Sequence, residues 1–172
     1  MKNPGWIPRP FLFILLTLGM LTAARCDTLK NWFNDPFLQV RNAVADCPVP
    51  LGPMISEDAA KADAHWRVER GTSCWLAGQC SKPNSYYYDA PISKSVQAHF
   101  ASDPAFAKSS LWLTFQRRYV WVEGCVDDPT ITANALEMFI RAEPDVEKVI
   151  VNVMPAGSGT APYPVAPRPH GQ

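Results

Sequence analysis

Two segments of alternating apolar residues on either side of Arg117-Arg118 constrain the fold more than any other feature of the sequence. Alternation with a period of two is typical of β-strands that bury one face. If the two arginines form a tight turn, Phe115 faces Val120 across a hairpin. The next pair on that face is then Leu113 with Val122, so both strands agree on one register. Paired arginines are unusual in a two-residue turn, and a longer loop that shifts this register is the alternative.

The predicted hairpin has two chemically different faces. One face is aliphatic and carries Leu111, Leu113, Phe115, Val120, Val122 and Gly124. The other face carries aromatic and polar side chains, namely Trp112, Thr114, Gln116, Tyr119, Trp121, Glu123 and Cys125. Large aromatic side chains left together in water would be an unusually apolar surface. We therefore expect either residues 27–88 or a partner to cover this second face.

A helix on each side of the hairpin and one more strand complete an α+β order within residues 89–154. Asp89 and Pro91 open the first helix, whose apolar residues are Ile92, Val96 and Phe100. Asp128-Pro129 opens the second helix, whose apolar stripe is Ile131, Ala135, Leu136, Phe139 and Ile140. Val149, Val151 and Val153 alternate as a third strand. The sequence predicts a helix–strand–strand–helix–strand unit, with a three-stranded mixed sheet and two helices on its aliphatic face.

Residues 25–88 are predicted to form a helical and loop extension. Asp35-Pro36 is a helix start, and one helical face follows at Phe37, Val40 and Val44. Ser56 is expected to cap a second helix that ends near Gly71. The segment from residue 71 to residue 88, which contains two cysteines, is expected to be a loop held by a disulfide.

The two ends of the chain have distinct compositions. Lys2 and Arg9 precede the apolar run Phe11 to Leu21 and a small-residue site before Arg25, which predicts a secretory signal peptide over 1–24. The apolar run is shorter than the ~20 residues that span a bilayer. The alternatives are an uncleaved anchor and lipidation at Cys26. Residues 155–172 are rich in proline and glycine without periodicity, which predicts a disordered tail.

The cysteines are expected to form disulfides, because an exported protein lies where disulfides persist. The candidates are Cys47, Cys74, Cys80 and Cys125, for which three pairings exist. Cys125 lies on the aromatic face, so a bridge from any of the other three could clamp the extension there. The Cys74-x5-Cys80 spacing does not fit a zinc or redox motif. No metal and no cofactor are expected.

Residues 91–154 resemble the BON domain of bacterial osmotically inducible and nodulation proteins. The segment 120–126, VWVEGCV, is similar to the family's strand that ends at its hallmark glycine, here Gly124. The segment 144–153, PDVEKVIVNV, is similar to the family's last strand, although Asp145 stands where the family often has glycine. The resemblance implies a small module of exported, periplasmic bacterial proteins that binds envelope components, phospholipids in particular, without catalysis or metal.

Charge and motifs limit the functions that the sequence allows. A formal net charge of zero disfavours nucleic-acid binding. His65, His99 and His170 lie in no catalytic motif, so an enzyme is not expected. We predict a non-catalytic envelope-binding protein whose partner is an envelope lipid or a periplasmic protein, with peripheral contact to the membrane surface. The alternative is a structural or accessory protein of an envelope assembly that acts through protein–protein contacts.

The candidate contact with lipid is the hairpin tip. Arginine and aromatic side chains favour the headgroup region of a membrane. The predicted binding residues are Arg117, Arg118, Trp112, Tyr119 and Trp121. The alternative is a two-arginine turn in water with no lipid role, since residues 89–154 carry more acidic than basic side chains and have no general attraction to anionic lipid.

Overall fold

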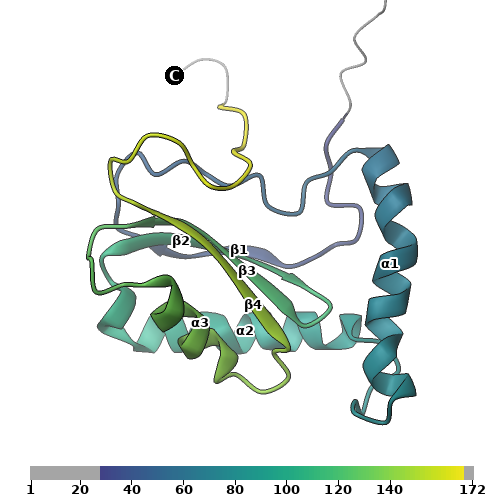
Figure 1. The fold of residues 1–172 in the computed structure, drawn as a ribbon. Coiled ribbons are helices and arrows are strands. Elements are labelled where there is room, and N and C mark those ends of the chain that lie inside the picture. Colours follow the sequence, from purple (N-terminus) through teal and green to yellow (C-terminus); the bar gives the residue numbers. More distant parts are fainter. Residues whose placement is uncertain (1–27, 169–172) are drawn as a thin grey trace, which may run out of the picture.

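The computed structural model describes residues 28–168 as an α+β fold (Figure 1). The predicted signal peptide, Cys26 and His170 lie outside the described residues. The elements follow in the order β1 (Phe37–Asn42), α1 (Glu57–Leu76), α2 (Tyr86–Ser102), a short 3-10 helix (Pro104–Phe106), β2 (Ser109–Gln116), β3 (Tyr119–Val126), α3 (Ala133–Arg141) and β4 (Lys148–Pro155).

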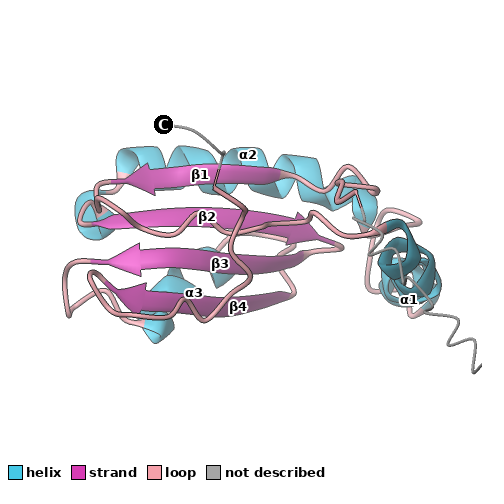
Figure 2. Cartoon of the chain, turned by 90° about the horizontal axis from the view of Figure 1, so that it is seen from above, coloured by secondary structure: helices cyan, strands magenta, loops and turns pink. Residues whose placement is uncertain are grey.

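The strands form one mixed sheet in the order β1-β2-β3-β4 (Figure 2). The first two pairings are antiparallel and the pairing of β3 with β4 is parallel. The predicted hairpin register is confirmed, because Phe115 pairs with Val120 and Leu113 pairs with Val122. The sheet has four strands rather than the predicted three, and the strand that the sequence analysis missed is β1.

The connection between β2 and β3 is a two-residue turn, not a longer loop. Arg117 has φ of 55° and Arg118 has φ of 69°, the backbone of the turns that match the twist of a hairpin. The carboxylate of Asp89 on α2 accepts the backbone N–H of both arginines, each at 2.7 Å. A buried acceptor on a neighbouring helix therefore fixes a turn that arginine would otherwise disfavour.

α2 and α3 cover the aliphatic face of the sheet, as predicted (Figure 1). The expected apolar residues of both helices are buried in one cluster with those of the strands. The fully buried members include Leu111, Leu113, Phe115, Val120 and Val122 from the hairpin, Val96 and Phe100 from α2, and Leu136 and Ile140 from α3. This core leaves the opposite face of the sheet free of helices.

The backbone at Gly124 requires glycine. Its φ is +145°, and a Cβ atom there would lie 2.0 Å from the backbone oxygen of Ser110 on β2. Any other side chain would push the two central strands apart, since backbone atoms cannot move aside as a flexible side chain can.

The helix predicted to begin at Asp35-Pro36 is wrong. Residues Phe37–Asn42 form β1, which pairs with β2 at the edge of the sheet. Leu38 and Val40 pack against the core with the period of two that a strand requires. The carboxylate of Asp35 caps no helix, because it binds the guanidinium of Arg67.

The other helix boundaries differ from the prediction at three points. Ser56 caps α1 as predicted, accepting from the backbone N–H of Ala59 at 3.2 Å. α1 continues through Gly71, where the missing side chain lets Asn84 approach, so that much of the predicted loop is helical. α2 begins earlier, at Tyr86. α3 is capped by Thr132 rather than by Asp128, and its apolar stripe is confirmed.

Two disulfides join the four candidate cysteines. Cys47 is bonded to Cys125, which is one of the three bridges to Cys125 considered above. This bond ties the extension to the second face. Cys74 is bonded to Cys80 between α1 and α2. Both bonds are typical of an oxidising compartment such as the periplasm or the cell exterior. Among residues 28–168, no helix is long and apolar enough to cross a membrane.

The prediction of a disordered tail is wrong for residues 156–168. This segment folds back beside the loop that follows Cys47 (Figure 1). The backbone N–H of Leu51 donates to Pro164 O at 2.7 Å, and that of Ala166 donates to Val49 O at 2.9 Å. Tyr163 is buried, and its hydroxyl donates to Pro48 O at 2.9 Å. Long-range hydrogen bonds and one buried ring therefore order a segment that has no periodicity of its own.

Candidate functional site

The guanidinium of Arg117 is buried within the fold. Its Nη1 lies 3.7 Å from Asp89 Oδ2, and the group lies 5.4 Å from the centre of the Tyr86 ring. Burial lowers the pKa of Arg117, and Asp89 opposes that effect. With 9% of its surface exposed, this side chain supports the turn rather than reaching outward.

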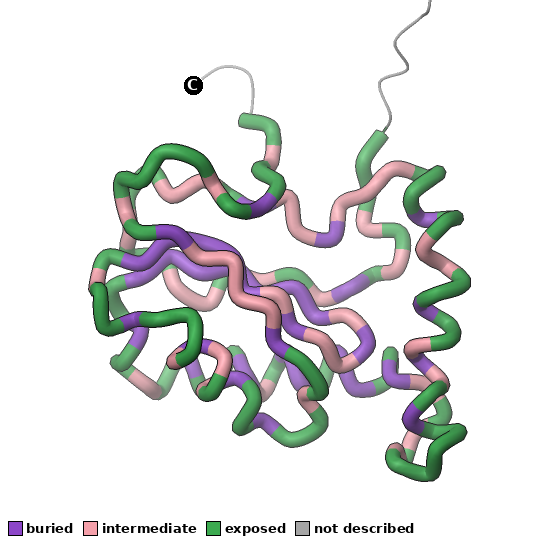
Figure 3. The backbone as a smooth tube through the Cα atoms, in the orientation of Figure 1, coloured by how far each residue is buried: buried purple, intermediate pink, exposed green. Residues whose placement is uncertain are grey.

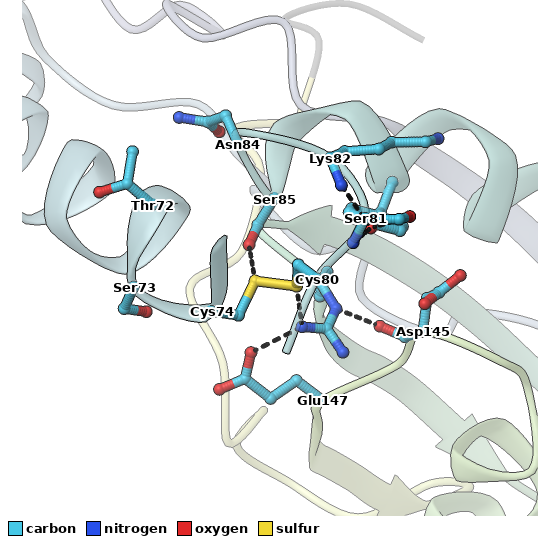
Figure 4. The surroundings of a disulfide bond; sticks show 12 residues. Thr72, Ser73, Cys74, Cys80, Ser81, Lys82, Asn84, Ser85, Asp145 and Glu147 are labelled. Atoms are coloured by element: carbon cyan, nitrogen blue, oxygen red, sulfur yellow. Dashed lines mark hydrogen bonds and ion pairs between the residues drawn. A yellow bond between two sulfur atoms is a disulfide. The ribbon is translucent and has the colours of Figure 1, made fainter. Parts of the chain in front are cut away.

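The guanidinium of Arg118 is also occupied. Its Nε donates to Asp145 O at 2.6 Å, and its Nη1 lies 3.6 Å from Glu147 Oε2. The same Nη1 lies 3.1 Å from Cys80 Sγ, so the hairpin tip rests on the Cys74–Cys80 disulfide (Figure 4). The two predicted arginines therefore hold the tip to neighbouring segments, and they do not present an exposed basic anchor.

The three predicted aromatic residues lie on the second face, defined here as the sheet face opposite α2 and α3. The Tyr119 and Trp121 rings are 6.1 Å apart between centres, and both residues are partly exposed. Trp112 is buried, with 8% of its surface exposed, and does not belong to the core beneath the helices. The structure thus brings Tyr119 and Trp121 together next to the turn, while Trp112 is buried.

The second face is partly covered from within the chain. The loop after Cys47 belongs to the extension that was expected to cover it, whereas the C-terminal segment was not expected to do so. The loop after Cys47 and the segment around Pro164 cross above the sheet, and α1 stands at one end of it (Figures 1 and 2). The tube in Figure 3 shows buried positions along the central strands and mixed burial in the segments above them. The covering is incomplete, because a hollow remains between these segments and the sheet.

This hollow, called the cavity below, has a volume of about 310 Å³ and is partly open to solvent. Its walls come from the loop before α1, from α1, from β2 and β3, and from the C-terminal segment. The lining residues are Gly52, Pro53, Ile55, Ala59, Asp63, Arg67, Thr114, Gln116, Trp121, Glu123 and Pro164. The volume is at the lower end of the range for sites that bind small molecules.

Glu123 is the exceptional group in this lining. It lies on β3 with 8% of its surface exposed. Within residues 28–168, its carboxylate has neither a hydrogen-bond donor nor a cation as partner. Burial raises the pKa of Glu123, and no neighbouring charge counteracts that effect. Among the described residues, the fully enclosed polar atoms without a partner lie on Arg41, Arg70, Arg117 and Glu143, so the Glu123 oxygens keep contact with solvent in the cavity. The burial of the rest of the residue still disfavours its charged form.

The other charged groups near the cavity are already paired. The Nη1 of Arg67 donates to both carboxylate oxygens of Asp35, at 3.0 and 2.8 Å, and its Nε donates to Asp63. The amide of Gln116 bridges Asp35, at 3.3 Å, and the guanidinium of Arg70, at 2.6 Å. This network fixes one wall of the cavity and leaves Glu123 as the free charge.

Sequence reasoning placed Glu123 on the second face but did not single it out as a functional residue. The available signal was an acidic residue between Trp121 and Cys125, on a face that was expected to be covered. Arg67 and Asp35 were missed because they meet only in the folded chain, 32 residues apart in the sequence.

The remaining chemical candidates are dispersed. His65 on α1 lies 3.2 Å from Glu69, and His99 on α2 lies 3.0 Å from Glu143, both away from the cavity lining. In the described part of the chain, no three His, Cys, Asp or Glu side chains are grouped so as to hold a metal ion.

Comparison with known proteins gives no assignment. No protein-family model, curated protein or solved structure matches this chain significantly. The resemblance to the BON domain therefore stays a prediction.

Proposed function

We propose that this chain is an exported envelope protein that acts by binding, with the cavity on the second face as its binding site. Glu123 is the observation that carries the proposal, because this largely buried residue opens its carboxylate into the cavity without a partner in the described chain. A ligand that supplies a complementary group would remove the cost of that unpaired charge. The fixed network of Arg67, Asp35 and Gln116 beside it is the preorganised wall that favours binding.

The order of helices and strands beneath the cavity is consistent with a BON-like domain. The order α2-β2-β3-α3-β4 is the helix–strand–strand–helix–strand order that the resemblance implies, and Gly124 lies next to Glu123 on β3. Under this proposal β1, α1 and the C-terminal segment are additions that build the cavity on the sheet. The disulfides support a periplasmic location.

The chemistry of the lining favours binding over catalysis. The side chains that line the cavity supply carboxylates, one guanidinium, one amide and one hydroxyl, without a histidine or a free thiol. Covalent catalysis needs a nucleophile within reach of a base. Thr114 is the one hydroxyl in the lining, and among the described residues it has no hydrogen bond to a base that could activate it.

A second function, accessory contact with another protein, is favoured by one observation on α1. Its last turns carry large apolar side chains in water, with 46% of Trp75 and 80% of Leu76 exposed. Photo-cross-linking in the intact envelope from position 76 tests this function, with exposed Lys94 on α2 as the control position. A defined adduct from position 76 alone supports it, and equal labelling from both positions contradicts it.

Titration of the isotope-labelled, disulfide-bonded protein by nuclear magnetic resonance tests the binding proposal. The panel consists of small amines, carboxylates, alcohols, sugars and inorganic phosphate at millimolar concentration. We expect at least one class to shift the Thr114 amide and the Trp121 indole N–H, while the indole N–H of Trp75, outside the cavity, stays unchanged. If no class shifts the cavity resonances, the cavity is not a binding site.

A further inference from the structure

We propose that the cavity selects ligands that carry an ammonium group, with the carboxylate of Glu123 as partner and the indole of Trp121 as the adjoining wall. The inference rests on the proposed function, since it names the chemical class that the same cavity would take. It is carried by three observations on the described residues: the balance of charge, the position of Trp121, and an unused hydroxyl.

The balance of charge favours a cation. Two carboxylates beside the cavity, Asp35 and Asp63, already bind the one guanidinium that lines it, Arg67. The carboxylate of Glu123 is therefore additional negative charge in a partly buried site. An anionic ligand would face repulsion there, whereas an ammonium group would form a charge-assisted hydrogen bond.

The position of Trp121 favours an organic ammonium group. Trp121 and Glu123 are two residues apart on β3, so their side chains share a face at a spacing of about 7 Å. A cation bonded to Glu123 would lie within reach of the indole face, where cation–π attraction acts over about 6 Å. Tyr119 stands beside Trp121, at 6.1 Å between ring centres, on the side away from Glu123 along the strand.

An unused hydroxyl favours a ligand with a second polar group. Thr114 lies opposite Trp121 in the β2–β3 register and lines the cavity. Its side chain makes no hydrogen bond to another residue of the described chain, and only 7% of the residue's surface is exposed. A compact molecule with a hydroxyl near its ammonium group would therefore satisfy two groups that the protein leaves open.

Three probes of nearly equal size separate charge from shape. Ethanolamine carries the ammonium group, ethylene glycol is its neutral counterpart, and glycolate is its anionic counterpart. Titrations followed at the Thr114 amide and the Trp121 indole N–H should give an affinity for ethanolamine at least about tenfold above that for either of the others. The spectrum reports the fold of the protein in the same measurement.

Two variants with matched controls assign the effect to the cavity. Glu123→Gln keeps the shape and removes the charge, so the affinity for ethanolamine should fall about tenfold. Trp121→Leu should weaken tetramethylammonium more than ethanolamine, because a quaternary cation depends on the aromatic wall. Glu137→Gln removes one charge from α3 on the opposite face and Trp66→Leu removes an exposed indole outside the cavity, so both should bind as the unaltered chain does.

A further arm distinguishes a free amine from a lipid headgroup. Vesicles of phosphatidylethanolamine present the same ammonium group as ethanolamine, and vesicles of phosphatidylglycerol lack it. Co-sedimentation with the first alone, lost in Glu123→Gln, identifies the lipid headgroup as the source. Binding of ethanolamine without co-sedimentation identifies a free small amine.

The outcomes separate this inference from the function on which it rests. If ethylene glycol or glycolate binds as tightly as ethanolamine, or if Glu123→Gln leaves the affinity unchanged, selection for ammonium is wrong while the cavity remains a binding site. If none of the probes and no member of the wider panel shifts the cavity resonances, both proposals are overturned.

Discussion

The carboxylate of Asp89 on α2 accepts the backbone N–H of Arg118 at 2.7 Å, across 29 residues of sequence. The contact joins the first helix of the core to the tip of the central hairpin. Asp89 is 2% exposed, and burial raises its pKa, while the hydrogen bonds from Arg118 and Arg117 oppose that effect. The turn and the carboxylate therefore depend on each other.

Removing this carboxylate should destabilise the chain strongly. Asp89→Ala leaves two backbone N–H groups without their acceptor and leaves the Arg117 guanidinium buried without its counter-charge. We expect a loss of about 3–5 kcal/mol in the free energy of unfolding, the usual cost of breaking a buried pair. Urea unfolding with the disulfides intact measures it. Asp58→Ala, at an exposed position on α1, should change stability by less than about 0.5 kcal/mol.

Substituting Gly124 should be as damaging, for a steric reason. Gly124→Ala places a methyl group 2.0 Å from the backbone oxygen of Ser110, at a φ of +145°. We expect a loss of about 3 kcal/mol or more, measured by thermal unfolding. Gly159→Ala is the control, since nothing lies within 4 Å of the Cβ position at Gly159. The stability of this variant should be nearly that of the unaltered chain. Equal melting temperatures for the two variants would contradict the close approach of β2 and β3.

The unliganded protein should lose stability with rising pH through Glu123. Its pKa in the folded chain is raised above the ordinary value of 4.5 by burial, so the folded chain binds this proton more tightly than the unfolded chain does. The contribution of this group is therefore greatest below its ordinary pKa and is lost as the pH rises through the folded-state pKa. Asp63 and Arg67 on α1 and Tyr163 on the C-terminal segment are the ionisable groups that face it.

In the Glu123→Gln variant the side chain cannot ionise, so the loss of stability with rising pH should disappear. We expect the variant to gain stability relative to the unaltered chain between about pH 4 and about pH 8, measured by urea unfolding. Glu137→Gln, on the opposite face, should show no such trend. A difference in stability that is independent of pH would show that Glu123 is not a strained carboxylate in the folded chain.

The two disulfides should differ in both stability and reactivity. Cys47–Cys125 spans 78 residues and Cys74–Cys80 spans 6, so the chain-entropy relation gives about 4.5 and about 2 kcal/mol respectively. The guanidinium of Arg118, 3.1 Å from Cys80 Sγ, should stabilise the departing thiolate when a reductant attacks Cys74. Each bridge has one buried cysteine, Cys125 at 2% and Cys74 at 8% exposed, so the guanidinium of Arg118 is the feature that distinguishes them.

Mass spectrometry after graded reduction and alkylation checks this order. Cys74 and Cys80 should be labelled before Cys47 and Cys125, and Arg118→Leu should slow that first reduction. Serine replacements of each pair give the two losses of stability. Labelling of the longer bridge first would contradict the proposed effect of Arg118 on Cys80.

The central hairpin was predictable because its evidence is local and redundant. Both strands alternate, and the two patterns agree on a single register with Phe115 opposite Val120. β1 was missed because Phe37, Val40 and Val44 fit a helical spacing while Leu38 and Val40 fit a strand, and periodicity cannot separate the two in so short a run. Pairing with β2 decided between them.

The cavity could not be predicted, because its parts meet only through long-range contacts. Alternation placed Trp121 and Glu123 on one face. Nothing in the local sequence indicated that the segment near Pro164 would bond to Leu51, more than a hundred residues away. The same holds for the tip, where the sequence showed two arginines but not that Asp89 and Glu147 would occupy them.

The strap formed by residues 47–51 and 163–166 joins two parts of the chain that are far apart in the sequence, and the cavity is complete only when both are in place. In the described chain, Pro164 is the one lining residue that follows β4, so a chain ending at β4 would have every strand of the sheet but an incomplete cavity. Closure awaits both the arrival of Tyr163 and the oxidation of Cys47 with Cys125. If the cavity binds a ligand as proposed, binding would therefore depend on an oxidising environment, because reduction of Cys47–Cys125 releases one side of the cavity from the sheet.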